Sequence, residues 1–485
     1  MRLLPALLLL LLLVPGVVAQ DPKPPAPFDF VKERLKAWEY LADKHADLGD
    51  DYKKAKVFTE ARKQYDRARE LVADLPRAMK GLGFEKQRGE WVQKEILPPK
   101  DEGTPAQVAE ARKKPDDGKL KDYTRCADRC RKLLDATRKA GTELEQRQAA
   151  SDLLYYAPDD AEARKLRGHI KDGDDWLPDF AKAWRDQGRK LMEKGTFGEV
   201  LQSEDEQAKL IGATFWCRQS ELLVVRTSVD ETRAKMMHRA VEVNTQRAME
   251  LLAIKEFPFG PGRKYTLTQV NSTELWEAML TKVMKLEGDT LEFNRKLAGT
   301  YTREPTGFMT RASVDASADD MIGNSTVIQI LVNHRGKGGD NPPWLTTGWG
   351  YLVTSQALGT TQTLRYTLDT QGQTSSSRNI IPEFSKKGGT PELLREVALH
   401  DVTFSKDLPL AALLLMKVND IDQSAAAKSF SLMEFLFQSY SDQTRKWLSA
   451  APTVDKERVQ ELEQAFGKPL AELETEWRQW VLARY

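Results

Sequence analysis

Two segments of the chain repeat the same pattern of small and aromatic residues, beginning at positions 78 and 163. In the first, residues 78–83 (AMKGLG) precede residues 89–92 (GEWV). In the second, residues 163–168 (ARKLRG) precede residues 174–177 (DDWL). The spacings from Ala to Gly and from Gly to Trp are the same in both copies. Each copy therefore predicts a helix that ends at a Gly, a short turn, and a Trp that packs back.

This repeated unit resembles tetratricopeptide-like helical repeats, which implies a helical region over residues 29–204. Two interpretations of the region are open. In one, the repeats are a scaffold that binds a protein. In the other they are a structural support, with Trp91 and Trp176 as core anchors.

Apolar residues at helical spacing surround the repeats. The first such series follows residue 30 and consists of Val31, Leu35, Trp38 and Leu41. Similar amphipathic patterns occupy residues 55–72, 123–136 and 143–155, and each predicts a helix. Residues 96–120 are rich in Pro, Lys and Asp, and we expect them to form an exposed connection.

The composition changes near residue 205. Residues 221–227, 264–270 and 307–312 are typical of strands, and residues 232–252 and 272–285 are typical of helices. This alternation predicts a small sheet with helices on it over residues 205–319. Residues 320–485 are expected to be mostly helical, so the predicted fold class is mainly α with a small α+β part.

The N-terminus has the pattern of a secretory signal peptide. A basic residue precedes an apolar run from Leu3 to Val18, and small residues favour cleavage after Ala19. Residues 20–28 form a Pro-rich linker, and no other stretch approaches the length of a membrane span. We therefore expect an exported protein, periplasmic or extracellular, with no membrane span once the signal is removed.

The balance of charge limits the classes of partner, and the number of cysteines limits the disulfides that the chain can form. The chain has 73 Lys plus Arg and 72 Asp plus Glu, which gives no overall bias toward nucleic acid. Three cysteines exclude a disulfide framework. Cys126 and Cys130, four residues apart on a helical pattern, are interpreted as two buried thiols, with a strained bridge as the alternative.

Three motifs carry a resemblance to a known family. Residues 342–351 (PPWLTTGWGY) resemble the P-x-W-L-x-E-G-x-A-x-(Y/F) segment of gluzincin metallopeptidases of the peptidase-MA-like type. Residues 429–436 resemble the S-x-x-L-x-x-F-L helix of that family, and residues 465–481 resemble its closing motif. The resemblance implies a gluzincin-like domain in the second half of the chain.

The residues that would perform the chemistry of that family are absent from this sequence. The family has an H-E-x-x-H helix that supplies two zinc ligands and a general base, and a Glu that supplies the third ligand. The chain contains no H-E-x-x-H, and Thr347 occupies the position of the third ligand. Neither Gln nor Asn is a good zinc ligand, and an alkyl side chain cannot accept a proton.

Two registers are open for the degenerate zinc helix. If Gln329 and Asn333 replace the two His, Ile330 replaces the Glu. If Ile330 and His334 replace them, Leu331 replaces the Glu. In both registers we expect no zinc, no other cofactor and no catalytic residue.

Other aromatic, histidine and acidic side chains give weaker indications of a cleft or of a different metal site. Trp344, Trp349 and Tyr351 either line a former cleft or belong to the core. Of the five histidines, His45 and His238 are expected to be solvated, and His169 to be structural. Glu396, His400 and Asp401 could join His334 or Asp340 in a rearranged metal site, although nothing in the sequence places them together.

These observations predict an exported pseudo-peptidase that binds a protein or peptide. Two alternatives are open: an active hydrolase with a rearranged metal site, and a purely structural envelope protein. Metal content and peptide cleavage separate the first alternative from the prediction, and capture of a partner separates the second.

Overall fold

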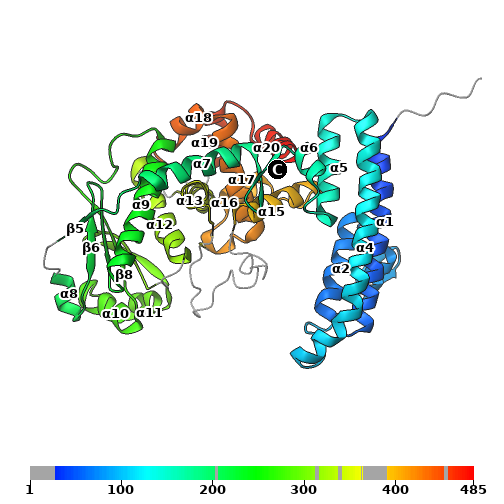
Figure 1. Ribbon diagram of the computed structural model, residues 1–485, viewed down its shortest axis with the longest axis horizontal. Coiled ribbons are helices and arrows are strands. Elements are labelled where there is room, and N and C mark those ends of the chain that lie inside the picture. The colour runs from blue at the N-terminus through cyan, green and yellow to red at the C-terminus, as the bar shows by residue number, and fades with distance from the viewer. Residues whose placement is uncertain are drawn as a thin grey trace, which may run out of the picture.

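The computed structural model describes residues 28–201, 206–311, 316–336, 341–361, 363, 390–452 and 457–485. The expected signal peptide, most of the Pro-rich linker and Asp340 lie outside these ranges. The described chain is mainly helical with small sheets, as the sequence predicts. Figure 1 shows an elongated molecule, with an arm of long helices at one end, a helical body in the middle and a sheet at the other end.

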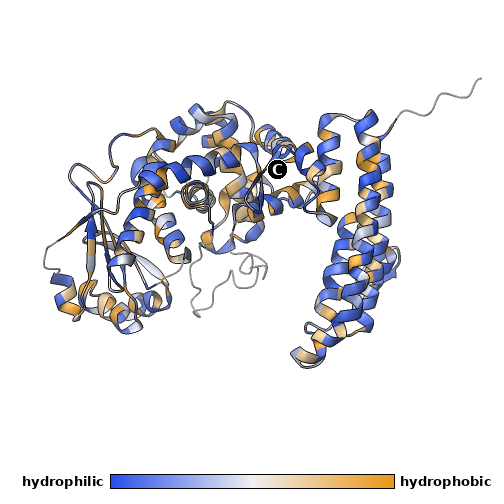
Figure 2. Cartoon of the chain, viewed as in Figure 1, coloured by the Kyte–Doolittle hydropathy of each residue, from blue (hydrophilic) through white to orange (hydrophobic). Residues whose placement is uncertain are grey.

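Four helices build the N-terminal arm: α1 (Phe30–Lys54), α2 (Phe58–Leu71), α4 (Pro105–Ala140) and α5 (Glu143–Tyr156). Figure 2 shows blue, hydrophilic residues along much of their length, interrupted by orange, apolar ones. Such amphipathic helices bury one stripe against their neighbours. The predicted helices at 55–72, 123–136 and 143–155 are confirmed within α2, α4 and α5.

The prediction of an exposed connection at 96–120 is wrong for most of its length, because α4 begins at Pro105. Thr104 caps this helix, accepting a hydrogen bond from the Gln107 backbone N–H, while the Gln107 side chain bonds the Thr104 backbone. This capping box, with Pro at the first helical position, is a favourable helix start. Pro115 lies inside the helix. The signal for the start of this helix was present in the sequence, but the high Pro and Lys content of residues 96–120 led to the prediction of a connection.

The buried face of α1 differs from the predicted one. Leu41 is buried, but Val31 and Leu35 are 65% and 51% exposed. Ala37, Ala42 and Ala46 are buried and face the neighbouring helices in their place. Small alanines allow helices to approach closely, so the contact stripe of α1 follows these residues rather than the larger apolar ones.

Both sequence copies form a short helix followed by a β-hairpin. The first is α3 (Pro76–Gly81) with β1 (Phe84–Gln87) and β2 (Glu90–Gln93). The second is α6 (Ala161–Leu166) with β3 (His169–Asp172) and β4 (Asp175–Pro178). Each Trp is half-buried and lies across the hairpin from a Lys: Lys86 pairs with Trp91, and Lys171 with Trp176. Neither Trp reaches the burial of a core anchor, and the Lys86 and Lys171 ammonium groups lie 5.8 and 5.7 Å from the Trp91 and Trp176 ring centroids.

Six strands of the described chain form a mixed sheet in the order β5-β6-β7-β8-β10-β9. Their bounds are β5 Glu199–Val200, β6 Trp216–Gln219, β7 Leu223–Thr227, β8 Tyr265–Gln269, β9 Gly299–Arg303 and β10 Thr306–Thr310. Strands β7, β8 and β10 are parallel, and the other pairs are antiparallel. The strands predicted at 221–227, 264–270 and 307–312 are confirmed in β7, β8 and β10.

Helices cover the sheet. Alternate residues of a strand point to opposite faces. Phe308 accordingly joins the core that contains α9 (Glu231–Leu252), whereas its neighbour Met309 packs with α10 (Thr273–Ala278) and the π-helical η1 (Met279–Val283). The remaining helices of this part are α8 (Glu206–Ile211) and α11 (Gly288–Lys296). The helices predicted at 232–252 and 272–285 are confirmed.

The helical body surrounds α13 (Pro343–Leu358), which Figure 1 shows end-on near its centre. Every residue of α13 from Trp344 to Ala357 is buried. The other helices of the body are α7 Asp179–Lys194, α12 Ala316–Arg335, α15 Pro391–Thr403, α16 Leu410–Leu415, η3 Val418–Asp420, α17 Gln423–Ser439, α18 Ser441–Leu448, α19 Arg458–Phe466 and α20 Leu470–Arg484. The core of this body begins at Leu177, inside the range 29–204 that the sequence groups with the repeats.

The arm joins the body at two places. At the first, Arg147 and Arg167 donate hydrogen bonds to the last carbonyls of α20, including Arg167 Nη1 to Leu482 O at 2.7 Å. These guanidinium groups satisfy helix-end carbonyls that have no intrahelical partner. At the second, His400 of α15 is hydrogen-bonded through Nε2 to Glu70 of α2 at 3.1 Å.

The His400 junction predicts that stability depends on pH. Burial lowers the pKa of His400, but hydrogen bonds with Asp401 and Glu70 outweigh burial and leave the pKa above its usual value. A raised folded-state pKa stabilises the protein fully below the unfolded pKa of about 6.5, and this contribution disappears as pH rises through the folded pKa. Hydrogen bonds from His400, Lys406 and Arg67 hold the pKa of Glu70 below its usual value, so Glu70 stays ionised near neutral pH.

We therefore expect the free energy of unfolding lost in His400→Gln to be larger at pH 5.5 than at pH 8.5. Denaturant titrations of wild type and variant at both pH values measure this difference. The contrasting control is His238→Gln. Burial lowers the pKa of His238, so protonation of the unfolded state should make the loss in this variant smaller at pH 5.5 than at pH 8.5. An equal loss at both pH values for His400→Gln would contradict the assignment.

Candidate functional site

The candidate site lies where α12 crosses α13, the two helices that contain the residues singled out by the resemblance to gluzincins. The Trp349 indole N–H donates to the Val327 carbonyl at 2.8 Å. A Cβ added to Gly350 would lie 2.6 Å from Asn324 Nδ2, so Gly350 allows the Asn324 side chain to lie directly against α13. Thr347 is three residues from Gly350, on the same face of α13.

The residues of α12 at this crossing precede both pairs that the resemblance suggested in the sequence. Asn324 lies against Gly350, and Ile328, four residues later, shares its face of α12. The two registers open from the sequence place their pairs further along α12. Asn333 is exposed, and its side chain donates to the backbone of Gln329 at 2.8 Å.

The second proposed pair also lies elsewhere. His334 is hydrogen-bonded through Nε2 to Ser449 Oγ at 3.0 Å, at the end of α18. Ile330 and Leu331 are both fully buried in the apolar core. α12 contains no Glu and one His, His334, whose hydrogen bond with Ser449 places it away from the crossing with α13.

The residues at the crossing do not fit a zinc ion. Zinc in proteins takes imidazole, thiolate or carboxylate ligands, whereas Asn324, Ile328 and Thr347 offer an amide, an alkyl group and a hydroxyl. All three are at most 2% exposed. In the part of the chain that the structure describes, no three His, Cys, Asp or Glu side chains are grouped closely enough to hold a metal.

The crossing does contain buried amides. Neither side-chain polar atom of Asn324 has a hydrogen-bond partner among the described residues, and the same holds for Asn244 Oδ1 on α9. The two amides flank Gly323, where an added Cβ would lie 2.5 Å from Asn244 Nδ2. A buried polar group without a partner costs about 1–3 kcal/mol. This polar cluster therefore opposes stability within an otherwise apolar core.

The three aromatic residues near the motif lie in the core and do not line an open surface. Trp344, Trp349 and Tyr351 are each at most 1% exposed. Trp344 stacks on Trp447 with ring centroids 6.0 Å apart, and Tyr351 donates to the Thr363 carbonyl at 2.7 Å. Their burial fits the core alternative rather than the cleft alternative.

Two histidine predictions are wrong. His45 and His238 are 1% and 0% exposed rather than solvated. His45 is hydrogen-bonded to Gln64 at 2.7 Å and to Tyr156 at 2.9 Å, and burial lowers its pKa to about 4. Charged residues around both positions in sequence suggested exposed helix faces. The partners of His45 come from α2 and α5, and His238 is hydrogen-bonded to the Thr196 carbonyl, so neither set of partners could be read from the sequence.

The remaining histidine and cysteine predictions concern structural roles. His169 is hydrogen-bonded to the Tyr485 carbonyl at 2.9 Å, which agrees with its expected structural role. Cys126 and Cys130 are free and buried, as predicted, and burial raises the pKa of Cys126 to about 12. His400 contacts Glu70 of the arm, so its side chain is already part of the junction described above.

Comparisons with protein-family models, with curated proteins and with solved structures found no match for the chain. Within the described ranges, no helix has both the length and the apolar composition needed to cross a bilayer.

Proposed function

We propose that this chain is a non-catalytic, gluzincin-like protein that is exported and acts by binding a protein or peptide. The observation that carries the proposal is the composition of the α12–α13 crossing. Asn324, Ile328 and Thr347 are buried there, and none of them can serve zinc as a ligand of the usual kind. The order of the three family-like motifs supports the relation to peptidases, and the pattern of residues 1–19 supports export.

Binding is the function that this arrangement favours over hydrolysis. A metallopeptidase needs a water-accessible metal and a general base beside it. The crossing supplies buried amides and alkyl groups, while the arm offers long exposed helix faces and a projecting hairpin. In the proposal, the tetratricopeptide-like arm supplies the binding surface, and the peptidase-like body supports it.

The first test is the zinc content of the purified full chain. We expect far less than one zinc ion per chain by elemental analysis, both after dialysis and after a challenge with added zinc. Hydrolysis of a mixed peptide substrate with zinc present should equal the rate without protein. An active gluzincin peptidase treated in the same way is the control. A zinc content near one per chain would overturn the proposal and direct mutagenesis to His334 and His400.

A further inference from the structure

The arm and the body have separate apolar cores. The arm core lies among α1, α2, α4 and α5, whereas the body core begins at Leu177. In the part of the chain that the structure describes, Phe404 is the one apolar side chain beyond Leu177 that packs against the arm core, with its ring centroid 5.2 Å from that of Trp38. Figure 1 shows the arm set beside the body at one end of the molecule. Parts that share such a small apolar interface are expected to move relative to each other unless other contacts fix the angle between them.

One of the two junctions lies where the chain passes from the arm to the body. The passage is at Gly168, between α6 and β3, which has a left-handed backbone conformation with φ of 73°. The neighbouring Arg167 donates from Nε to the Tyr485 carbonyl at 3.0 Å and from Nη1 to the Leu482 carbonyl at 2.7 Å. Because the chain is continuous here, this junction stays together and serves as the hinge.

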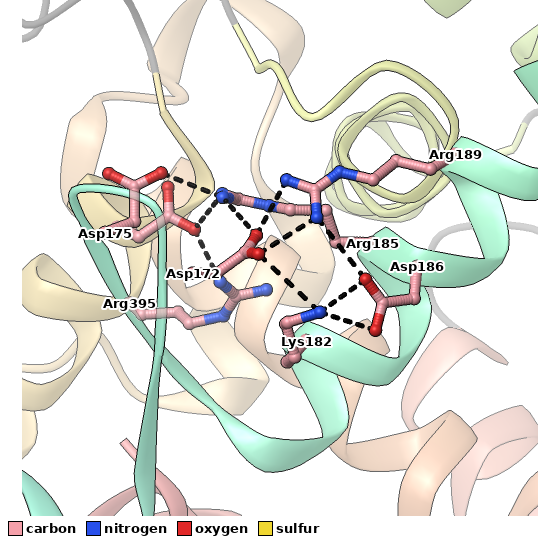
Figure 3. Close-up of polar contacts among 8 residues, drawn as sticks. Asp172, Asp175, Lys182, Arg185, Asp186, Arg189 and Arg395 are labelled. Carbon is pink, nitrogen blue, oxygen red and sulfur yellow. Dashed lines mark hydrogen bonds and ion pairs between the residues drawn. The ribbon is translucent and has the colours of Figure 1, made fainter.

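The hairpin of β3 and β4 that follows the hinge is fixed to the body by ion pairs. Arg189 of α7 donates two hydrogen bonds to Asp172 at 2.9 and 2.8 Å, and Arg185 donates to Asp175 at 2.8 Å. Arg185 also donates to Glu392 of α15 at 2.9 Å. Figure 3 shows Arg185 and Arg189 turned toward the carboxylates of the hairpin. The hairpin therefore belongs to the body, and any turning of the arm takes place before it.

The second junction joins side chains that are 330 positions apart in the sequence. His400 of α15 lies between two carboxylates, with Nε2 3.1 Å from Glu70 Oε2 and Nδ1 3.1 Å from Asp401 Oδ1. Lys406 of the body and Arg67 of α2 also donate to Glu70, at 2.7 and 2.9 Å. This junction lies away from the chain connection, so it can open while the hinge stays closed.

The arrangement around His400 requires two donated protons. Each ring nitrogen faces a carboxylate, and only the protonated imidazole has two N–H groups. The charged groups that face the ring are Glu70 and Arg67 from α2, Asp401 from its own helix and Lys406 beyond that helix. Burial lowers the pKa of His400, but the hydrogen bonds with Asp401 and Glu70 outweigh it and raise that pKa above its usual value. A neutral His400 bonds one carboxylate and turns a lone pair toward the other.

We propose that the contact of His400 with Glu70 is a pH-dependent latch that fixes the arm against the body. When His400 is protonated, the imidazolium bonds both carboxylates and holds the arm. When it is neutral, one of these bonds is lost and the arm turns about Gly168. The closed state is therefore favoured below the ordinary His pKa of about 6.5 and loses this advantage as pH rises through the raised pKa of the closed state. The latch acts whether or not the arm binds a partner.

The distance between arm and body measures the latch directly. Spin labels on non-natural amino acids at Lys114 of α4 and Ala412 of α16, two exposed positions, leave the three cysteines untouched. By double electron–electron resonance on the purified full chain, we expect one distance at pH 5.5 and a second population at a different distance at pH 8.5. Far-UV circular dichroism should be the same at both pH values, because the helices stay folded.

Variants assign the response to the latch. His400→Gln should give the same distance distribution at both pH values, because the titrating group is gone. Glu70→Gln should show the second population already at pH 5.5, since it removes the carboxylate that His400 and Lys406 bind. The matched controls are His238→Gln in the body and Glu39→Gln on an exposed face of α1, and both should respond to pH like wild type.

Three outcomes would each overturn the inference. They are identical distributions in wild type at both pH values, a pH response that persists in His400→Gln, and a second population at pH 5.5 in Glu39→Gln.

Discussion

Replacing Arg395 with Met is expected to lower the free energy of unfolding by about 3–5 kcal/mol, because it leaves a buried carboxylate without its partner. Arg395 Nη2 lies 2.5 Å from Glu434 Oε1, and Arg395 Nε donates to Oε2 at 3.1 Å. The Glu434 side chain is fully buried. Burial lowers the pKa of Arg395, but the attraction of Glu434 outweighs burial and leaves that pKa above its usual value.

The position of this pair gives the variant its large effect. Arg395 belongs to α15 and Glu434 to α17, and Tyr485 donates a hydrogen bond to the same carboxylate at 2.5 Å. Three segments of the body therefore meet at one buried charge. Once the guanidinium is lost, Glu434 must either stay ionised in an apolar environment or take up a proton, and both cost free energy.

Chemical denaturation of wild type and variants measures the effect. In the double variant Arg395→Met, Glu434→Leu, much of the loss should be recovered, since apolar residues can replace a buried ion pair at little cost. The matched control is Lys36→Met. Lys36 belongs to a pair with Glu33 in which both side chains are at least 40% exposed, so its loss should be about 0–1 kcal/mol. Equal losses in Arg395→Met and Lys36→Met would contradict the expectation.

The sequence predicted elements whose signals are local. Strands β7, β8 and β10 have runs of β-branched and aromatic residues, and α9 has apolar residues at helical spacing. The start of α4 was also encoded locally, in the Thr104 capping box, but the Pro and Lys content around it was given more weight. The buried face of α1 could not be predicted from local sequence, because it depends on how the neighbouring helices pack. Small alanines form this face instead of Val31 and Leu35.

The candidate site was harder to predict from sequence motifs than the helices and strands were. The sequence assigned Thr347 a position only through the resemblance of the Pro-Trp-Leu segment to the gluzincin pattern. The helix α12 contains no Glu and a single His, His334, so residue type left two registers open. The crossing at Gly350 places Asn324, and the helix face that it shares with Ile328, against α13, and neither register considered from the sequence contains this pair.

On the proposed gluzincin-like relation, introducing the zinc motif at Asn324, Ser325, Ile328 and Thr347 is expected to create a zinc site. The variant carries Asn324→His, Ser325→Glu, Ile328→His and Thr347→Glu, which gives two imidazoles at i and i+4 and a carboxylate from α13. Without metal, the new buried polar groups should lower the melting temperature. With zinc at 100 to 1,000 times the dissociation constant, binding to the folded state should raise the free energy of unfolding by about 2.7–4.1 kcal/mol. Elemental analysis should find about one zinc ion per chain.

The matched control makes the equivalent changes in the first of the two registers considered from the sequence: Gln329→His, Ile330→Glu, Asn333→His and Thr347→Glu. Asn333 is exposed and its side chain bonds to its own helix, so these ligands should not converge, and zinc should leave the melting temperature unchanged. If the variant that contains Asn324→His is too unstable to purify, the same comparison uses that variant without Ser325→Glu. A zinc-dependent rise in melting temperature in the control, and none in the variant that contains Asn324→His, would show that the position inferred from the helix crossing is wrong.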